Sequence, residues 1–327
     1  MTDAGIAAVA SAPAEAGRPP RVRVQRRPLH GVLLLDKPLG LSSNDALQKA
    51  KWLLRAEKAG HTGTLDPLAT GLLPLCFGAA TKFSQFSLDA DKRYLATLAL
   101  GIRTTTGDAE GEVLERREVE DIPAERIAQA CAAFVGEIDQ MPPMHSALKH
   151  EGKALYEYAR QGIEIERKSR RVTIHAIDIV AMHAGTVTLD VRCTKGTYIR
   201  TLAEDIGAAL GCGASLAALR RTGSGGLTLE GSITLAALEA LPDGQRAALL
   251  MSPDRLLADA PELRLPAAEA ARFLSGLRRR VEAPDADRVR VYGPETRAFL
   301  GSAHIISGEL IADRLLTPPE VQALLSA

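Results

Sequence analysis

The chain has 327 residues, of which 46% are hydrophobic and 24% charged, and its basic and acidic side chains balance to a formal net charge of zero. This length predicts about two globular domains, and the zero net charge argues against nonspecific nucleic-acid binding through bulk charge. The four cysteines are scattered without metal-ligand spacing, which predicts reduced thiols rather than a zinc site or a disulfide framework. No apolar run approaches the ~20 residues of a membrane-spanning helix.

Residues 1–27 are predicted to form a disordered basic tail. The segment is rich in Ala, Pro and Gly but lacks the basic-then-apolar order of a secretory signal. Its arginines have no acidic residue among them and are Arg18, Arg21, Arg23, Arg26 and Arg27. Contact with RNA phosphates and a plain solvated leader explain them equally well.

A buried strand and a capped helix follow the tail. The apolar run at residues 31–35 predicts a short strand, which the turn from Asp36 to Gly40 brings to an end. Ser42 or Ser43 can cap the next helix, in which apolar residues recur at helical spacing up to Leu54.

The loop at residues 60–71 contains three glycines and carries Asp66. Because Pro67 disfavours the helical conformation of the residue before it, Asp66 is held extended or in a turn, as a nucleophile would be presented. The glycines allow positive φ and a close approach of the backbone to a ligand. An ordinary Asp-Pro turn explains the same residues, and His61 by itself indicates only a structural or surface histidine.

The sequence in the middle of the chain predicts alternating strands and helices. Residues 93–100 read as a strand with Tyr94 at its start, and a polar turn follows at residues 101–111. The remaining predictions are a helix at about 123–135, an extended loop at 141–146, a short helix carrying Tyr156 and Tyr158, a hairpin of strands at 172–179 and 186–193, and a helix at about 232–241.

A helix that ends near Leu210 is predicted to hold Tyr198 and Arg200 in its first turn. An arginine at a helix start opposes the macrodipole, which favours a specific partner for Arg200 over simple exposure. Basic side chains also cluster before the strand at 172–179 and at the end of a later strand: Arg167, Lys168, Arg170, Arg171, Arg220 and Arg221.

Turn-forming residues at about 241–253 predict a domain boundary, with a large domain at 28–250 and a small one at 251–327. The small domain contains a predicted helix from Pro266 and short strand-like runs separated by glycine turns. Three consecutive arginines from Arg278 would make this β-barrel-like module an RNA-binding accessory, and a plain packing domain is the alternative.

Taken together, the motifs in residues 28–225 closely resemble those of the bacterial TruB-type tRNA pseudouridine synthases. No single motif is unique to the family, but the ordered set is specific. The matching segments are residues 35–38, 42–44, 60–71, 91–94, 144–149, 155–162, 195–200, 211–214 and 219–221. Beyond residue 250, only the position and strand pattern resemble the PUA-like module of these enzymes.

The resemblance implies an α+β fold, with a mixed, largely antiparallel sheet flanked by helices and a small C-terminal β-rich PUA-like domain. It also implies a cytoplasmic enzyme that isomerises a uridine in the T arm of tRNA, at position 55 of the TΨC loop, to pseudouridine. No metal or other cofactor is expected, since the reaction has no net redox change and no second substrate. We expect a monomer without an obligate protein partner and without membrane attachment.

Catalytic roles are likewise implied by the resemblance. Asp66 falls on the catalytic aspartate, Tyr94 on the tyrosine that stacks against the reacting base, and Arg200 on the arginine that pairs with the aspartate. Asp66 would either attack the sugar or assist removal of a proton from it. Arg200 would keep this carboxylate ionised in a pocket of low dielectric.

The resemblance implies substrate contacts as well. His61 falls on the histidine that enters the RNA loop beside the target nucleotide, and Tyr198 and Leu219 fall on positions that line the substrate pocket. Contacts to the RNA backbone are expected from Arg167, Lys168, Arg170, Arg171, Arg220 and Arg221.

Two other functions compete with the synthase. A noncatalytic RNA-binding protein or tRNA-folding chaperone would explain the basic clusters but would leave the combination of Asp66, Tyr94 and Arg200 as coincidence. An aspartate-nucleophile phosphatase would need a second carboxylate two residues after the nucleophile and a magnesium site, and the sequence has Leu68 at that position.

Overall fold

A computed structural model of the protein describes residues 25–119, 122–295 and 298–326. The predictions for residues 1–24 therefore lie outside the described residues. The last two arginines assigned to the tail contact the folded body. Arg26 donates a hydrogen bond to the Ala56 carbonyl at 2.9 Å, and Arg27 donates one to the Leu54 carbonyl at 3.0 Å.

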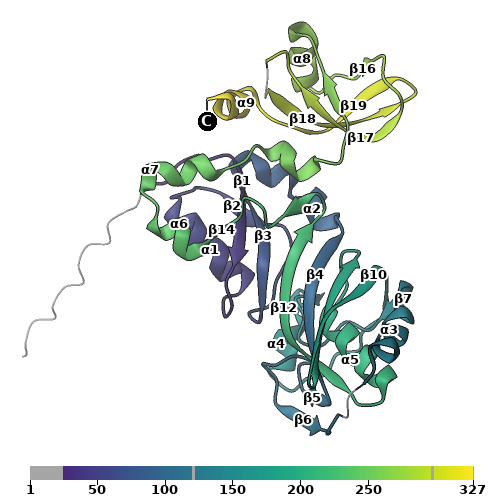
Figure 1. Ribbon diagram of the computed structural model, residues 1–327. Coiled ribbons are helices and arrows are strands. Elements are labelled where there is room, and N and C mark those ends of the chain that lie inside the picture. Colours follow the sequence, from purple (N-terminus) through teal and green to yellow (C-terminus); the bar gives the residue numbers. More distant parts are fainter. Residues whose placement is uncertain (1–24, 120–121, 296–297, 327) are drawn as a thin grey trace, which may run out of the picture.

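A ten-stranded mixed sheet forms the larger part of the molecule (Figure 1). Its main order is β14-β1-β3-β12-β4-β11-β10-β7, with β2 added to β3 and β13 to β12. Only the β1–β14 and β3–β12 pairs are parallel, which confirms the largely antiparallel sheet. The strands are β1 (Gly31–Lys37), β2 (Ala59–His61), β3 (Ala69–Phe77), β4 (Lys92–Leu100), β7 (Gly136–Gln140), β10 (Arg170–His183), β11 (Thr186–Cys193), β12 (Ala214–Ser224), β13 (Leu227–Thr228) and β14 (Ile233–Thr234).

Helices flank this sheet, and their apolar faces build the main core. Leu47 and Leu53 of α1, Ile127 of α3 and Leu202 and Ile206 of α5 are buried against strand residues. The helical segments are α1 (Ser43–Leu53), η1 (Gly78–Phe83), α2 (Ser84–Asp89), α3 (Ala124–Ala132), α4 (Leu155–Ala159), α5 (Ile199–Leu210), α6 (Leu235–Ala240), α7 (Asp243–Arg246), η2 (Ala247–Leu249) and η3 (Pro253–Leu257). Two small hairpins pair β5 (Ile102–Thr104) with β6 (Val113–Arg116) and β8 (Lys149–His150) with β9 (Lys153–Ala154).

A second sheet, in the order β15-β17-β18-β19-β16, contains the C-terminal strands. It lies at one end of the molecule, at the top of Figure 1, and confirms the β-rich C-terminal part. Its elements are β15 (Glu262–Arg264), α8 (Ala267–Leu274), β16 (Arg279–Arg280), β17 (Ala286–Tyr292), β18 (Phe299–Ile306), β19 (Glu309–Leu315) and α9 (Pro318–Leu325). An apolar cluster connects the two sheets and includes Val32, Leu72 and Phe83 on one side and Tyr292 and Phe299 on the other.

The helix predicted at about 232–241 begins later than expected. Ile233 and Thr234 pair in parallel with β1, so they belong to the sheet. The Thr234 hydroxyl then accepts a hydrogen bond from the Ala237 amide at 3.1 Å, which caps α6 and fixes its start at Leu235. The predicted pattern was correct about the helix but missed the strand pairing, because that pairing depends on β1, about 200 residues away in the sequence.

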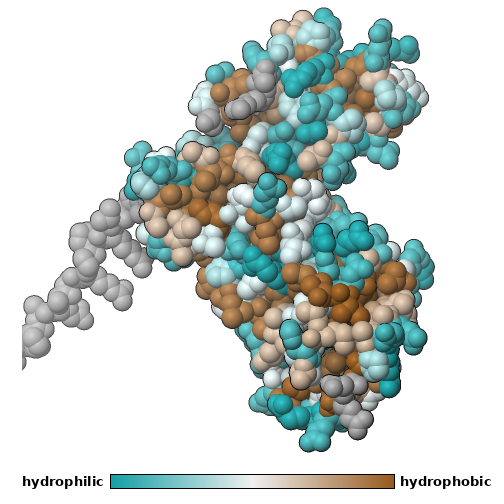
Figure 2. Space-filling view, viewed as in Figure 1, coloured by the Kyte–Doolittle hydropathy of each residue, from teal (hydrophilic) through white to brown (hydrophobic). Residues whose placement is uncertain are grey.

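Figure 2 shows a mixture of hydrophilic and hydrophobic side chains on this face of the molecule, with hydrophilic ones spread over the C-terminal part. Among the residues that the structure describes, no helix is both long enough and apolar enough to cross a membrane.

Candidate active site

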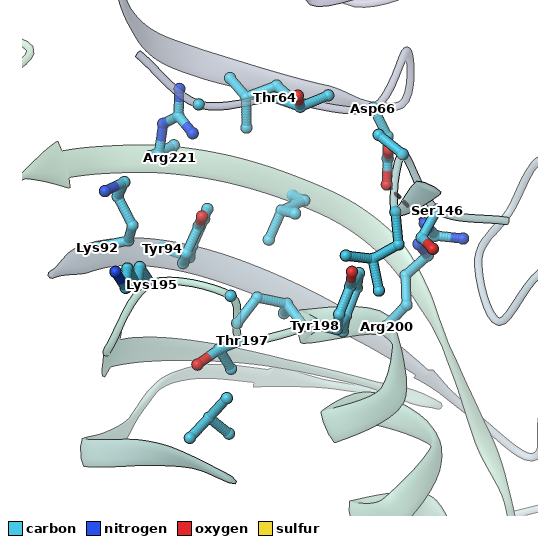
Figure 3. A pocket seen from close by; sticks show the side chains of 18 of the residues that line it. Thr64, Asp66, Lys92, Tyr94, Ser146, Lys195, Thr197, Tyr198, Arg200 and Arg221 are labelled. Atoms are coloured by element: carbon cyan, nitrogen blue, oxygen red, sulfur yellow. Dashed lines mark ion pairs between the residues drawn. The ribbon is translucent and has the colours of Figure 1, made fainter. Parts of the chain in front are cut away.

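A cavity of about 620 Å³ opens beside the central strands of the large sheet. Its walls come from the loop that carries Asp66, from β4 and β12, and from the segment that leads into α5. Figure 3 shows the side chains that point into it. Five of the six residues predicted to act on the base or the sugar line this cavity: Asp66, Tyr94, Tyr198, Arg200 and Leu219.

The Asp66 loop lies between β2 and β3 and is held in place by α1. The Leu65 amide donates a hydrogen bond to the Ser43 hydroxyl at 2.7 Å, and that hydroxyl donates to the Leu65 carbonyl at 3.0 Å. Ser42, rather than Ser43, caps the helix by accepting from the Asp45 amide. Ser43 is therefore free to fix the backbone next to Asp66, a role that the sequence did not reveal.

The loop ends where β3 and β12 approach closely at Gly71. Gly71 has a φ of +98°, and a Cβ at this position would lie 2.3 Å from the Arg221 carbonyl oxygen. Only glycine fits a positive φ and this backbone contact together. The expected close backbone approach is therefore present at Gly71, but it is an approach to a neighbouring strand.

Asp66 and Arg200 form an ion pair at one end of the cavity, with 2.9 Å between Arg200 Nη2 and Asp66 Oδ2 (Figure 3). The Asp66 side chain is 43% exposed and faces the opening, whereas the Arg200 side chain is only 7% exposed. Arg200 also donates to the Thr106 carbonyl at 3.1 Å and to the His145 carbonyl at 2.6 Å. The specific partner predicted for Arg200 is thus Asp66.

Asp108 is a second acidic neighbour of Arg200. Its Oδ2 lies 3.5 Å from Arg200 Nε, and its side chain is 4% exposed. Its other oxygen, Oδ1, accepts hydrogen bonds from the Thr106 hydroxyl at 2.6 Å and the Glu110 amide at 3.1 Å. The predicted polar turn therefore gives Arg200 a second carboxylate, at Nε, besides Asp66 at Nη2.

The start of α5 positions Tyr198, which is the N-cap residue. The Tyr198 amide donates to the side chain of Gln140 at 3.0 Å, and the Gln140 amide group donates back to the Tyr198 carbonyl at 3.3 Å. Burial raises the pKa of the Tyr198 phenol, so it stays protonated at neutral pH. The neutral ring is suited to form an apolar wall of the cavity.

Tyr94 and Leu219 enter the cavity from neighbouring strands. Tyr94 lies on β4 opposite Arg221 of β12, and Leu219 lies two residues before Arg221 on the same face. The Tyr94 side chain is buried except for the part that borders the cavity, with 9% exposure. An aromatic ring at this position is suited to stack against a base that enters the cavity.

Arg221 was predicted to contact the RNA backbone, and the structure contradicts this prediction. Arg221 is 1% exposed, and its Nε donates to the Leu72 carbonyl at 2.7 Å inside the molecule. The preceding residue, Arg220, points to the other face of the strand and forms two hydrogen bonds with Asp36, at 3.0 and 2.7 Å. Adjacent strand residues face opposite sides, so one of the two arginines had to be turned inward.

The other basic residues differ in exposure, and the exposed Arg171 also lies 3.7 Å from Glu137 and from Asp139 of β7. Arg167 donates to the Pro142 carbonyl at 3.0 Å and lies 3.1 Å from Glu164, so its side chain is engaged within the protein. Lys168, Arg170 and Arg171 are exposed at the start of β10, where Arg170 and Arg171 also border the cavity.

His61 lies at the end of β2, opposite Leu75 of β3, and is not among the residues that line the cavity. Its Nδ1 is buried without a hydrogen-bond partner among the described residues. Burial, reinforced by the positive charge of Arg221, lowers the pKa of His61 and favours the neutral ring at physiological pH. A neutral ring next to the loop is compatible with insertion into RNA, and that role stays a prediction.

Within the described residues, no group of three His, Cys, Asp or Glu side chains is arranged to hold a metal ion. The cavity instead combines one exposed carboxylate, a buried guanidinium that fixes it, and aromatic walls. Such an arrangement can hold a flat heterocycle against Tyr94 and Tyr198 while a carboxylate works on the attached sugar.

Three family models together match most of the chain. Residues 51–199 match the TruB family pseudouridylate synthase N-terminal domain, and residues 200–257 match the tRNA pseudouridylate synthase B C-terminal domain. Residues 261–316 match the C-terminal domain described as pseudouridine synthase II TruB. A tRNA pseudouridine synthase B from Verminephrobacter eiseniae is 59% identical over 313 residues, which cover 94% of this chain and 95% of that protein. The chain belongs to the TruB family.

Other TruB relatives are similarly close. A tRNA pseudouridine synthase B from Ralstonia nicotianae is 61% identical over 300 residues, covering 89% of this chain and 95% of the relative. Among solved structures, a chain in the crystal structure of a Cbf5-Nop10-Gar1 complex matches with a TM-score of 0.69 and 25% identity, over 93% of this chain and 89% of that one. The TruB fold of this chain is thus shared with a protein of much lower sequence identity.

Proposed function

We propose that this TruB family member isomerises a uridine in the T arm of tRNA, at position 55, to pseudouridine. The observation that carries the proposal is the Asp66–Arg200 ion pair at the edge of a cavity with aromatic walls. The relatives at about 60% identity are named tRNA pseudouridine synthase B, and the identity extends over nearly their whole length.

In the proposed reaction, Asp66 starts cleavage of the bond between N1 of the uracil and C1′ of the ribose. Asp66 either attacks C1′ or removes a proton from the sugar, and in both cases the electron pair of the broken bond stays on the uracil. The uracil then turns and rejoins the sugar through C5, which breaks the Asp66–C1′ bond if Asp66 attacked C1′, or is followed by return of the proton to the sugar if Asp66 removed one. Arg200 keeps the carboxylate of Asp66 charged and oriented, because it forms the ion pair while anchored to two backbone carbonyls.

The target base has to leave the RNA stack before Asp66 can reach its sugar. Extruding a base costs a few kcal/mol, and stacking on an aromatic face contributes about 1–3 kcal/mol in return. We propose that Tyr94 supplies this face, that Tyr198 and Leu219 enclose the base, and that His61 fills the space left in the RNA.

RNA contacts outside the cavity are proposed for the exposed side chains of Lys168, Arg170 and Arg171 beside its opening. Phosphate contacts of this kind weaken as salt rises. We further propose a catalytic domain at 28–250, a PUA-like RNA-binding accessory domain at 251–327, and a cytoplasmic monomer that needs no obligate partner and no cofactor.

The proposal is tested with purified protein and an unmodified tRNA transcript, without added metal or cofactor. We expect one uridine of the T arm to be converted, mapped by carbodiimide treatment and primer extension. Asp66→Asn should abolish conversion and still bind the transcript. Conversion by Asp66→Asn would rule out the catalytic role of Asp66, and loss of folding or binding would favour a structural role in the turn.

A noncatalytic chaperone is the alternative, and the exposed basic side chains near the cavity are the feature that favours it. Such a protein would bind and refold the transcript but leave every uridine unchanged. Nucleoside analysis of the recovered transcript separates the two functions, because isomerisation changes the chromatographic identity of the nucleoside without changing its mass.

A further inference from the structure

Arg221 is a buried cation that borders the cavity without a carboxylate partner among the described residues. Its Nε donates to the Leu72 carbonyl, but its Nη2 is buried and has no hydrogen-bond partner there. Burial lowers the pKa of Arg221, and the ionisable group that acts against this effect is the phenol of Tyr94. An unpartnered buried charge is costly, so packing alone does not explain an arginine at this position.

Strand pairing places Arg221 directly opposite Tyr94. The two residues are cross-strand partners in the antiparallel β4–β12 pair, and such partners have side chains on the same face with Cβ atoms about 4.5–5.5 Å apart. Lys92 lies two residues before Tyr94 and shares that face. Figure 3 shows Arg221, Lys92 and Tyr94 together at one end of the cavity, with Asp66 and Arg200 at the other.

Lys92 adds a second positive charge, and no carboxylate in the described part of the chain contacts it. Its ammonium group donates to the Ser87 carbonyl at 2.9 Å and to the Ala90 carbonyl at 2.5 Å. Burial, followed by the charge of Arg221, lowers the pKa of Lys92 to about 8, so most of it is still protonated at neutral pH. The end of the cavity that holds Tyr94 is therefore positively charged.

Several titratable groups lie around Tyr94, and Figure 3 also draws Lys195 beside it, which pairs with Asp89 at 2.6 Å. Arg221 faces it from β12, Cys193 from β11, Asp66 from the loop before β3, and Lys92 from its own strand. Burial raises the pKa of the Cys193 thiol to about 11, so Cys193 carries no charge at neutral pH, and Asp66 is paired with Arg200. Burial raises the pKa of the Tyr94 phenol, and the adjacent Arg221 acts against that rise.

We propose that Arg221 is a positioning residue for Tyr94. The guanidinium of Arg221 stabilises the Tyr94 phenolate, and this phenolate takes the proton from C5 of the rejoined base. This inference rests on the proposed function. When C1′ has bonded to C5, that carbon still carries its hydrogen. The phenolate accepts this proton, and the C–H electron pair returns to the ring as its C5–C6 double bond. N1 takes a proton from water, and Tyr94 is left protonated, which is its resting form because its pKa is raised above the ordinary value; before each turnover its phenol gives that proton to water.

The kinetic test compares Arg221→Met and Arg221→Lys with the wild-type protein in single-turnover conversion of the T-arm uridine across pH. General acid–base catalysis contributes about 10²–10⁴-fold, so we expect Arg221→Met to be slower by about tenfold or more at neutral pH. Its rate should recover as pH rises, because hydroxide restores the phenolate. Arg221→Lys keeps the charge and should retain most of the rate. A loss that is independent of pH would overturn the proposal.

A double-mutant cycle identifies the group through which Arg221 acts. If the effect passes through Tyr94, Arg221→Met should cause little further loss in a Tyr94→Phe background. If the two substitutions slow the reaction independently, so that their fold losses multiply in the double variant, the proposal is overturned. Arg192→Met is the matched control, because Arg192 is an exposed arginine next to Val191, the residue opposite Tyr94 on β11. Variants are compared after circular dichroism and tRNA binding show a folded, binding-competent protein.

A third measurement does not depend on activity. The chain contains five tyrosines, so ¹³Cζ-tyrosine labelling gives few NMR signals, and Tyr94→Phe assigns the one from Tyr94. The pKa of Tyr94 should be higher in Arg221→Met than in the wild type and close to the wild type in Arg221→Lys. An unchanged titration would overturn the proposal. A shifted titration in a protein that makes no pseudouridine would instead refute the proposed function and leave the Arg221–Tyr94 coupling established.

Discussion

Asp66 and Arg200 owe their positions to residues that are distant from them in the sequence. Ser43 holds the backbone next to Asp66 through two hydrogen bonds, and Arg200 is held by the carbonyls of Thr106 and His145. The guanidinium of Arg200 is therefore held in one orientation when it pairs with Asp66. Lysine has a single point of charge and cannot reproduce this geometry.

Arg200→Lys should slow conversion of the tRNA uridine although the positive charge is kept. A hydrogen bond to a charged group is worth about 1.5–3 kcal/mol, and loss of one such bond corresponds to about a tenfold to hundredfold lower single-turnover rate. Arg126→Lys is the control, because Arg126 also donates to a backbone carbonyl of α5, that of Leu210, but is not among the cavity-lining residues. Equal rates for the two variants would contradict the role of the Arg200 guanidinium.

Helix α9 fastens the C-terminal part to the large sheet. Thr317 and Glu320 form a capping box at its start, and Glu320 also pairs with Lys82 of η1 at 2.6 Å. Lys82 donates in addition to the Leu315 carbonyl at 3.1 Å. One carboxylate thus contributes both to the local helix start and to a contact between segments far apart in the chain.

Glu320→Gln should lower the melting temperature at neutral pH, and the difference from wild type should vanish in acid. Burial alone would raise the pKa of Glu320, but hydrogen bonds from Lys82 and Thr317 bring it below its ordinary value of 4.5. The stability from the ionised group is present above the ordinary pKa and is lost as pH falls through the lowered one. Thermal unfolding at both pH values measures the effect, with the exposed Glu282→Gln as control. A difference that persists in acid would show that charge is not its source.

At the scale of the whole molecule, the apolar cluster between the two sheets joins the C-terminal part to the large sheet. Phe299 of β18 packs against Phe83 of η1, with ring centroids 5.2 Å apart, and against Tyr292, at 5.6 Å. Phe273 is equally buried but belongs to a cluster formed within the C-terminal part. Substitution of Phe299 therefore tests the contact between the two sheets, whereas substitution of Phe273 tests the stability of the C-terminal part alone.

Phe299→Ala and Phe273→Ala should each lower the free energy of unfolding by about 3–5 kcal/mol. Only Phe299→Ala should also uncouple the two parts, so that calorimetry resolves two unfolding transitions. Calorimetry on the full chain checks both variants. A single transition in Phe299→Ala, or two transitions in Phe273→Ala, would contradict the assigned role of the cluster.

The sequence by itself predicted many of the helices and strands, and its resemblance to the TruB family predicted the mixed sheet and five of the residues that line the cavity. Apolar periodicity and capping signals are local, so α1, α5 and the β10–β11 hairpin were predictable. The unfavourable position of Arg200 at a helix start also indicated a partner, and the structure supplies Asp66.

Only the tertiary structure decided which neighbouring side chains face the cavity. Arg220 and Arg221 are chemically identical, and alternation along a strand requires opposite directions for them without saying which one points inward. The pairing of β12 with β4 makes that choice and sets Arg221 against Tyr94. The start of α6 and the support of Asp66 by Ser43 likewise depend on segments distant in the sequence, because strand register and loop contacts form only when the chain folds.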